Sequence, residues 1–219
     1  MKTLTSQLVE LSNGLLNEVP EVRDETGYYT MCDDGGVEHE VGNFLYGLVK
    51  ILQPKHILET GTYTGVSSLY MAQALKDNKH GDLITLEVEN THKQRAEKLW
   101  QACGVADQVD CILIPSLDYT VHQDFELLFL DSEPQYRFAE LVKFFPYLKE
   151  GGYVGIHDLP NSLCQGNFNP DHPEMKSYPY GDLPEQIKDW LKTDKLRMMH
   201  FPSPRGLTFF YKTKESDYR

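Results

Sequence analysis

The chain has 219 residues, of which 40% are hydrophobic and 25% charged, the proportions of an ordinary folded domain. Its net charge of −12 repels phosphate backbones and therefore disfavours a nucleic-acid partner. No apolar run reaches membrane-spanning length, and residues 1–6 lack the apolar core of a signal peptide. We therefore expect a cytoplasmic protein with no membrane partner.

The first 36 residues predict a helix followed by a loop, which together cap the domain. Leucines recur at helical spacing through residues 4–15 and form one apolar face. The acidic stretch Asn17–Gly36 lacks this periodicity and predicts a loop. Three roles remain open for the leucine face: packing within the chain, the seam of a homodimer, or a roof over the cofactor.

Residues 37–158 predict alternating helices and strands, the core that would bind a cofactor. A helix with one apolar face includes residues 41–52 and ends before Pro54. Strands are expected over residues 57–59, 83–87, 109–114, 125–131 and 153–157. Further helices are expected over residues 66–75, 91–103 and 136–148, with Gly151 and Gly152 following the end of the last one. This alternation predicts right-handed crossovers and a doubly wound, mostly parallel sheet.

Residues 159–182 predict a long loop rich in Pro, Asn, Gly and Tyr, of the kind that often forms a lid over a binding site. A short helix is expected over residues 183–191, and strands over residues 196–201 and 207–212, with a hairpin turn between them. The fold class is therefore α/β, with a seven-stranded sheet that ends in an antiparallel hairpin. No linker divides the chain, so we expect a single domain over residues 1–219.

The segment from Ile57 to Ser68 is the most informative part of the sequence. It predicts a short strand, a tight turn and the first turn of a helix, with the pattern Glu-x-Gly-x-x-x-Gly at Glu59, Gly61 and Gly65. Glycines let a ligand approach the backbone closely. A pyrophosphate-binding turn carries G-x-G-x-x-G and no adjacent carboxylate. The acidic residue therefore favours a cation such as S-adenosylmethionine over a nicotinamide dinucleotide.

Polar residues also end the other predicted parallel strands, at Glu87, at Asp131, and at His157 with Asp158. Ligands of open α/β sheets bind beyond the carboxyl ends of the strands. A carboxylate at Glu87 can accept hydrogen bonds from both hydroxyls of a ribose, and a solvated strand-end acid is the alternative.

With these residues the chain resembles the class I S-adenosylmethionine-dependent methyltransferases, in particular the small O-methyltransferases of the catechol type and their bacterial relatives. The resemblance extends from Gly42 to Asp158 and includes the pattern Leu-Glu-x-Gly-x-Tyr-x-Gly-x-Ser, which begins at Leu58. It implies a Rossmann-like methyltransferase fold and methylation of a small-molecule hydroxyl. It also implies the following cofactor-binding residues: Glu59, Gly61, Thr62, Tyr63, Gly65, Ser67, Glu87, Ser116, Leu117 and Asp131. A packed turn aromatic is the alternative for Tyr63, and a helix cap is the alternative for Ser67.

The catalytic residues implied by the resemblance are only partly present. The catechol-type site holds a divalent metal with two aspartates and one asparagine, and it uses a lysine base. Asp131 and Asp158 match the aspartates, whereas Leu159 and Pro134 stand at the asparagine and lysine positions. Two carboxylates with waters can still hold Mg²⁺, so a metal site at Asp131 and Asp158 stays open beside a structural role for both residues.

His157 is the candidate general base, because a histidine near neutral pKa suits proton transfer, with a structural histidine as the alternative. The expected catalytic residues are therefore His157, Asp131 and Asp158. We expect an S-adenosylmethionine-dependent methyltransferase with a small-molecule acceptor. A degenerate cofactor-binding module that acts through a partner is the alternative.

Overall fold

The structure, a computed structural model, describes residues 22–23, 30–31, 36–159, 184–201 and 205–214. The predicted N-terminal helix and the predicted lid, apart from Leu159, lie outside these residues. The described residues fall into two compact units. The first lies within residues 1–55 and 62–115, and the second within residues 56–61 and 116–219.

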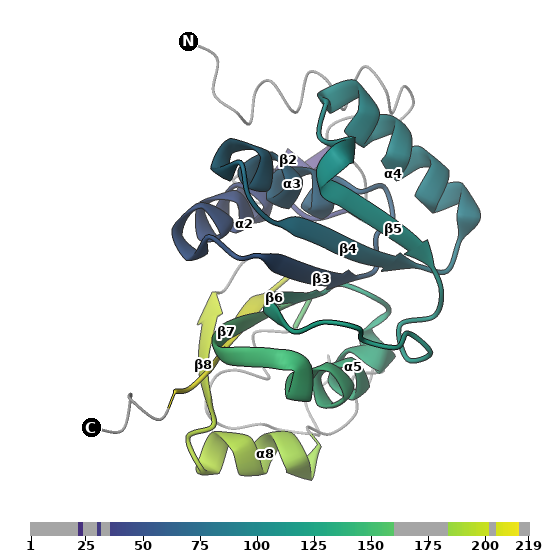
Figure 1. The fold of residues 1–219 in the computed structure, drawn as a ribbon. Coiled ribbons are helices and arrows are strands. Elements are labelled where there is room, and N and C mark those ends of the chain that lie inside the picture. The colour runs from purple at the N-terminus through teal and green to yellow at the C-terminus, as the bar shows by residue number, and fades with distance from the viewer. Residues whose placement is uncertain (1–21, 24–29, 32–35, 160–183, 202–204, 215–219) are drawn as a thin grey trace. The chain divides into compact units, whose positions relative to one another are not determined.

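Seven strands form one sheet in the order β5-β4-β3-β6-β7-β9-β8 (Figure 1). Their bounds are β3 (His56–Thr60), β4 (Asp82–Glu87), β5 (Val109–Leu113), β6 (Phe125–Leu130), β7 (Leu148–His157), β8 (Leu196–Phe201) and β9 (Leu207–Lys212). The pairs β4–β5, β3–β6 and β6–β7 are parallel, whereas β7–β9 and β8–β9 are antiparallel. The predicted seven-stranded, mostly parallel sheet with a terminal antiparallel hairpin is confirmed.

The first unit contains β4, β5 and three long helices. The helices are α2 (His39–Leu52), α3 (Val66–Asn78) and α4 (Asn90–Cys103), and the 3-10 turn η1 (Ala106–Gln108) precedes β5. Helices α2 and α3 pack closely, because a Cβ at Gly42 would lie 2.4 Å from the Tyr70 ring. The Tyr70 hydroxyl is also 2.8 Å from Nδ1 of His39 in a buried hydrogen bond.

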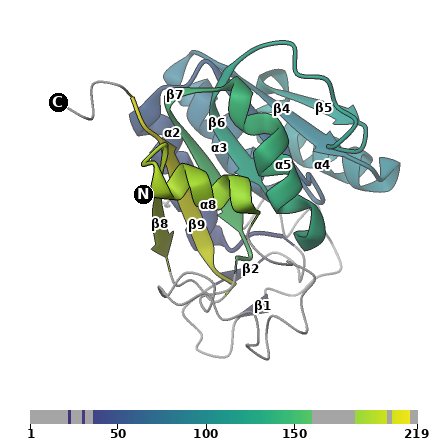
Figure 2. The same ribbon diagram turned by 90° about the horizontal axis from the view of Figure 1, so that it is seen from below.

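The second unit contains β3, β6, β7, β9 and β8 with two helices, α5 (Arg137–Phe144) and α8 (Glu185–Lys192). The 3-10 turns η2 (Pro134–Tyr136) and η3 (Phe145–Tyr147) flank α5. Figures 1 and 2 show α5 and α8 on the same face of these strands. Trp190 of α8 stacks on Phe145, with ring centroids 3.9 Å apart, and this contact holds α8 against the unit.

Two of the predicted elements are wrong. The helix expected over residues 136–148 ends at Phe144, since Pro146 interrupts it, and β7 begins at Leu148. Gly151 and Gly152 lie inside β7 rather than after a helix, at a register shift between β6 and β7. The loop expected over residues 17–36 contains two short antiparallel strands, β1 (Val22–Arg23) and β2 (Thr30–Met31).

The other predicted helices and strands in the described ranges differ from the structure by a few residues at their ends. Strands β8 and β9 match their predicted bounds. Among the described residues, no helix combines the length and the apolar character that a membrane crossing requires.

Candidate active site

In the first unit, Glu87 fastens the turn before α3 to the end of β4. Its Oε2 accepts the N–H of Tyr63 at 2.8 Å, and its Oε1 accepts the N–H groups of Val88 and Glu89 at 2.8 and 2.9 Å. Tyr63 has a left-handed φ of +48°, which costs energy for a residue with a Cβ. The bond to Glu87 helps to hold it there, so the structure brings together two predicted cofactor residues.

His92 is a neighbour of this pair that the sequence analysis missed. Its ring meets the Tyr63 ring edge to face at 4.8 Å, and its Nδ1 lies 3.6 Å from Oε1 of Glu87. The position of His92 in the first turn of α4, directly after the end of β4, was the available signal.

Thr62 and Ser67, two further predicted cofactor residues, are both buried. The Thr62 hydroxyl lies 2.7 Å from that of Thr85 and 3.7 Å from Sγ of Cys111, so it is directed at the protein. Ser67 is not a helix cap, because the N-cap of α3 is Gly65 and no side chain caps this helix.

The glycines of the turn are required by packing within each unit. Gly61 has φ +82°, and its Cβ would lie 2.3 Å from the backbone oxygen of Asp131. Gly65 has φ +80°, and its Cβ would lie 2.8 Å from Nε1 of Trp100. Packing alone therefore requires glycine at both positions, and the approach of a ligand to their backbone stays a prediction. Glu59, which begins the pattern, is completely buried in β3.

In the second unit, Glu140 of α5 is a buried carboxylate that the sequence analysis did not identify. It accepts hydrogen bonds from the hydroxyls of Thr60 at 3.0 Å, Ser132 at 2.8 Å and Ser116. Burial raises the pKa of Glu140, and these three bonds oppose the rise. Ser116, predicted to flank an adenine, is therefore tied to Glu140, whereas the side chain of Leu117 is exposed.

The three predicted catalytic residues come together at the carboxyl ends of β6 and β7, as expected from their places in the sequence. Nδ1 of His157 lies 3.1 Å from Oδ1 of Asp131 and 3.4 Å from Oδ1 of Asp158. The His157 side chain is completely buried, while those of Asp131 and Asp158 are 11% and 15% exposed. The carboxylates therefore form the more accessible part of the cluster.

Two arginines complete this cluster, and neither was predicted. Nη2 of Arg137 lies 3.4 Å from Oδ1 of Asp131 and 3.3 Å from Oδ2 of Asp158. Nε of Arg205 lies 2.5 Å from Oδ1 of Asp158, and its Nη2 lies 2.7 Å from Oδ2. Burial raises the pKa of Asp158, but attraction to His157, Arg137 and Arg205 outweighs this effect, so the net pKa is lowered.

The donor set of this cluster can be tested against a divalent metal. Asp131, His157 and Asp158 each offer one ligand atom, and these atoms lie within 4.8 Å of one another. However, Arg137 contacts both carboxylates, and Arg205 contacts both oxygens of Asp158. Since guanidinium groups contact three of the four carboxylate oxygens and bring two positive charges to them, the cluster as arranged does not fit a divalent cation.

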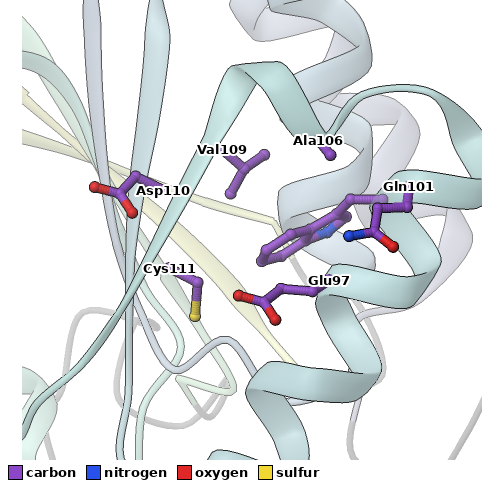
Figure 3. A pocket seen from close by; sticks show the side chains of 7 residues that line it. Glu97, Gln101, Ala106, Val109, Asp110 and Cys111 are labelled. Carbon is purple, nitrogen blue, oxygen red and sulfur yellow. The ribbon is translucent and has the colours of Figure 1, made fainter.

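A hollow between α4 and β5 of the first unit is unrelated to these residues (Figure 3). It is lined by Glu97, Trp100, Gln101, Ala106, Val109, Asp110 and Cys111. None of the predicted site residues lines it, so we do not assign it to the active site.

A model of the O-methyltransferase family matches residues 10–212. A catechol O-methyltransferase of Niastella koreensis is 36% identical over 98 residues, which are 42% of this chain and only 43% of that enzyme. Caffeoyl-CoA O-methyltransferase 1 of Eucalyptus globulus is 28% identical over 178 residues, which are 76% of this chain and 70% of that enzyme.

Among solved structures, the O-methyltransferase TomG of Streptomyces achromogenes, in complex with SAM, is similar in fold. Its TM-score is 0.70 at 20% identity, and the match covers 98% of this chain and 92% of that one. At this level of identity the likeness establishes the fold alone.

Proposed function

Because the chain belongs to the O-methyltransferase family, we propose that it transfers the methyl group of S-adenosylmethionine to a hydroxyl of a small molecule. The hydroxyl oxygen forms a bond to the methyl carbon while the bond from that carbon to sulfur breaks. The products are a methyl ether, S-adenosylhomocysteine and a proton. Such a displacement requires the two reacting groups to be held in line at about 3 Å.

The observation that carries this proposal is the arrangement of Glu87. An ionised carboxylate has about four acceptor positions, and three backbone N–H groups occupy three of those on Glu87. The remaining position suits one ribose hydroxyl of the cofactor. Three donors on one carboxylate also fix its orientation, as binding to a rigid sugar requires.

The start of α3 suits the methionine end of the same cofactor. The first N–H groups of a helix lack intrahelical partners and attract carboxylates. Helix α3 begins at Val66, after Gly65 in the left-handed conformation, and Ser67 and Ser68 lie in its first turn. We propose that the methionine carboxylate binds there, beside the Tyr63 turn.

For the acceptor proton, the buried position of His157 points to a supporting role. Because its ring is completely buried and Nδ1 contacts Asp131, we propose that His157 orients this carboxylate rather than touching the acceptor. Asp131 then receives the proton. The acceptor oxygen becomes strongly acidic as its bond to the methyl group forms, so a carboxylate can accept this proton.

Two further statements remain predictions. They are a cytoplasmic location and a homodimer seam formed by the leucines of residues 4–15. Those leucines lie outside the residues that the structure describes.

The proposal is tested by calorimetric titration of the protein with S-adenosylhomocysteine and with NAD, together with labelled methyl transfer to a panel of hydroxyl compounds. We expect S-adenosylhomocysteine to bind and NAD not to bind. Glu87→Gln should weaken binding by about 10- to 100-fold, because an amide cannot accept all three N–H groups. Glu89→Gln makes the same charge change on an exposed neighbour and should leave the affinity unchanged. Equal affinities in the two variants would contradict this assignment.

A further inference from the structure

We propose that Arg137 and Arg205 take the place of a divalent cation between Asp131 and Asp158, so that methyl transfer by this chain needs no metal. The inference rests on the proposed function and concerns only the second unit. It starts from the five side chains at the ends of β6 and β7, which form one ionic cluster.

The two arginines balance the charges of the two aspartates without a metal, and His157 lies close to both carboxylates as well. Asp131 and Asp158 contribute two negative charges, and Arg137 and Arg205 contribute two positive charges. Two guanidinium groups thus bring the charge that a single divalent cation would bring. A guanidinium remains protonated at any pH at which proteins fold, so this positive charge is permanent.

The hydrogen bonds of Arg137 hold its side chain in a fixed position within the cluster. Its Nε donates to the carbonyl of Ser132 at 2.7 Å, its Nη1 donates to the carbonyl of His157, and its Nη2 faces both aspartates. The side chain is only 3% exposed. Four of its five N–H groups thereby have acceptors, which fixes the guanidinium between the two strand ends.

Arg205 approaches the cluster from the turn between β8 and β9. Its Nη2 donates a hydrogen bond to Oδ2 of Asp158 at 2.7 Å, and its Nε lies 2.5 Å from Oδ1 of the same carboxylate in an ion pair. Asp158 itself has a left-handed φ of +57°. The two arginines therefore engage a carboxylate whose backbone conformation is costly for a residue with a Cβ.

A metal would have to displace these groups before it could bind. It would compete with the arginines for three of the four carboxylate oxygens, and it would meet two permanent positive charges at short range. Leu159, which is buried next to Asp158, offers no ligand atom. The geometry therefore excludes a metal for as long as Arg137 and Arg205 stay in place.

The acceptor class follows from this arrangement. A bound metal can hold two adjacent oxygens of one acceptor, whereas Arg137 has nearly all of its donors engaged within the protein. An acceptor with two neighbouring hydroxyls should therefore bind no better at this cluster than an acceptor with one. We expect compounds with a single hydroxyl to be methylated at rates comparable to those of vicinal diols of similar size.

The first experiment uses the intact wild-type protein. Binding of Mn²⁺ is measured by electron paramagnetic resonance of the free ion, and methyl transfer is measured in EDTA and in Mg²⁺. We expect no Mn²⁺ binding up to about 1 mM, the weak end of protein sites for divalent cations. Transfer rates in EDTA and in Mg²⁺ should agree within about twofold, whereas loss of an essential metal lowers rates by more than about a hundredfold.

The second experiment removes the arginine charges. Arg137→Met with Arg205→Met frees both carboxylates beside His157, and this double variant should gain Mn²⁺ binding. The control is Arg197→Met, which removes a surface arginine paired with Asp194 and should gain none. Circular dichroism establishes whether the double variant is folded. If the double variant does not fold, the Mn²⁺ binding and transfer rates of the wild-type protein alone test the inference.

The inference is overturned if the wild-type protein binds Mn²⁺, if EDTA abolishes transfer and Mg²⁺ restores it, or if the folded double variant fails to bind Mn²⁺. Absence of transfer with every acceptor, with or without Mg²⁺, would instead contradict the proposed function. The Mn²⁺ measurements test this inference independently of the proposed function, because they need no methyl acceptor.

Discussion

Replacing Gly61 by alanine tests whether the strand–turn–helix segment is shaped by packing. The φ of +82° is unfavourable for alanine by about 1–2 kcal/mol. The added Cβ would lie 2.3 Å from the backbone oxygen of Asp131 and 2.6 Å from the backbone nitrogen of Ser132, so a strand end must move. Overpacking of this kind costs about 1–3 kcal/mol. Together, Gly61→Ala should lower the free energy of unfolding by about 2–5 kcal/mol.

Two other glycines separate these contributions. Gly104 has φ +68°, but its Cβ would meet only Nζ of Lys76 at 3.4 Å, so Gly104→Ala should cost about 1–2 kcal/mol from the backbone alone. Gly47 lies within α2 with nothing within 4 Å of its Cβ position. Gly47→Ala should therefore stabilise the protein by about 0.5–1 kcal/mol.

Thermal and denaturant unfolding of the three variants provide the assay. For a chain of this length, 1 kcal/mol shifts the melting temperature by roughly 2–4 °C, so the expected differences are measurable. The predicted order of stability is Gly47→Ala, wild type, Gly104→Ala and Gly61→Ala. A Gly61→Ala variant as stable as Gly104→Ala would refute the argument that the Asp131 backbone closes this space.

Two further predictions concern pH. Burial raises the pKa of Glu140, so its contribution to stability is complete below the ordinary value of 4.5 and is lost as pH rises through the raised pKa. As pH rises from about 5 to 8, the free energy of unfolding should therefore fall less for Glu140→Gln than for the wild type, as measured by thermal unfolding at each pH. If the two proteins lose stability equally over this range, the raised pKa of Glu140 is contradicted. The lowered pKa of Asp158 has the opposite consequence, because its contribution is present above the ordinary value of 3.8 and is lost as pH falls through the lowered pKa. Asp158→Asn should thus lower the free energy of unfolding by about 1–3 kcal/mol at neutral pH and by progressively less in acid. A difference between variant and wild type that does not change with pH would be inconsistent with the Arg137 and Arg205 contacts.

The sheet could be predicted from the sequence because its strands are short apolar runs bounded by turn residues. The run at residues 207–212, for example, lies between Gly206 and a polar segment, and β9 has the same bounds. The helix over residues 136–148 was misplaced because its apolar spacing continues past Pro146 into β7. Gly151, with φ +78°, lies near the irregular pairing of β6 with β7, and in a single sequence such a glycine looks like a helix end.

The candidate site was predictable only where its residues end parallel strands. Asp131, His157 and Asp158 meet because the carboxyl ends of neighbouring parallel strands share one edge of a sheet. Arg137 and Arg205 could not be identified in this way, since each lies outside the strands and contacts partners distant in sequence. Glu140 was missed for the same reason, because its three hydroxyl donors come from separate segments.

The second unit is discontinuous in the chain, and this affects how a newly made protein can fold. Strand β3 is synthesised before residues 62–115, whereas its parallel partner β6 follows them. Strand β9, which lies between β7 and β8, is synthesised after both. On the ribosome, the β4–β5 pair can therefore form while the second unit still has open strand edges. Such edges can pair with other chains, and contacts this distant in sequence form slowly. Strand β3 gains its partner β6 only when residue 130 has emerged, and the second edge of β7 stays open until β9 is complete at residue 212.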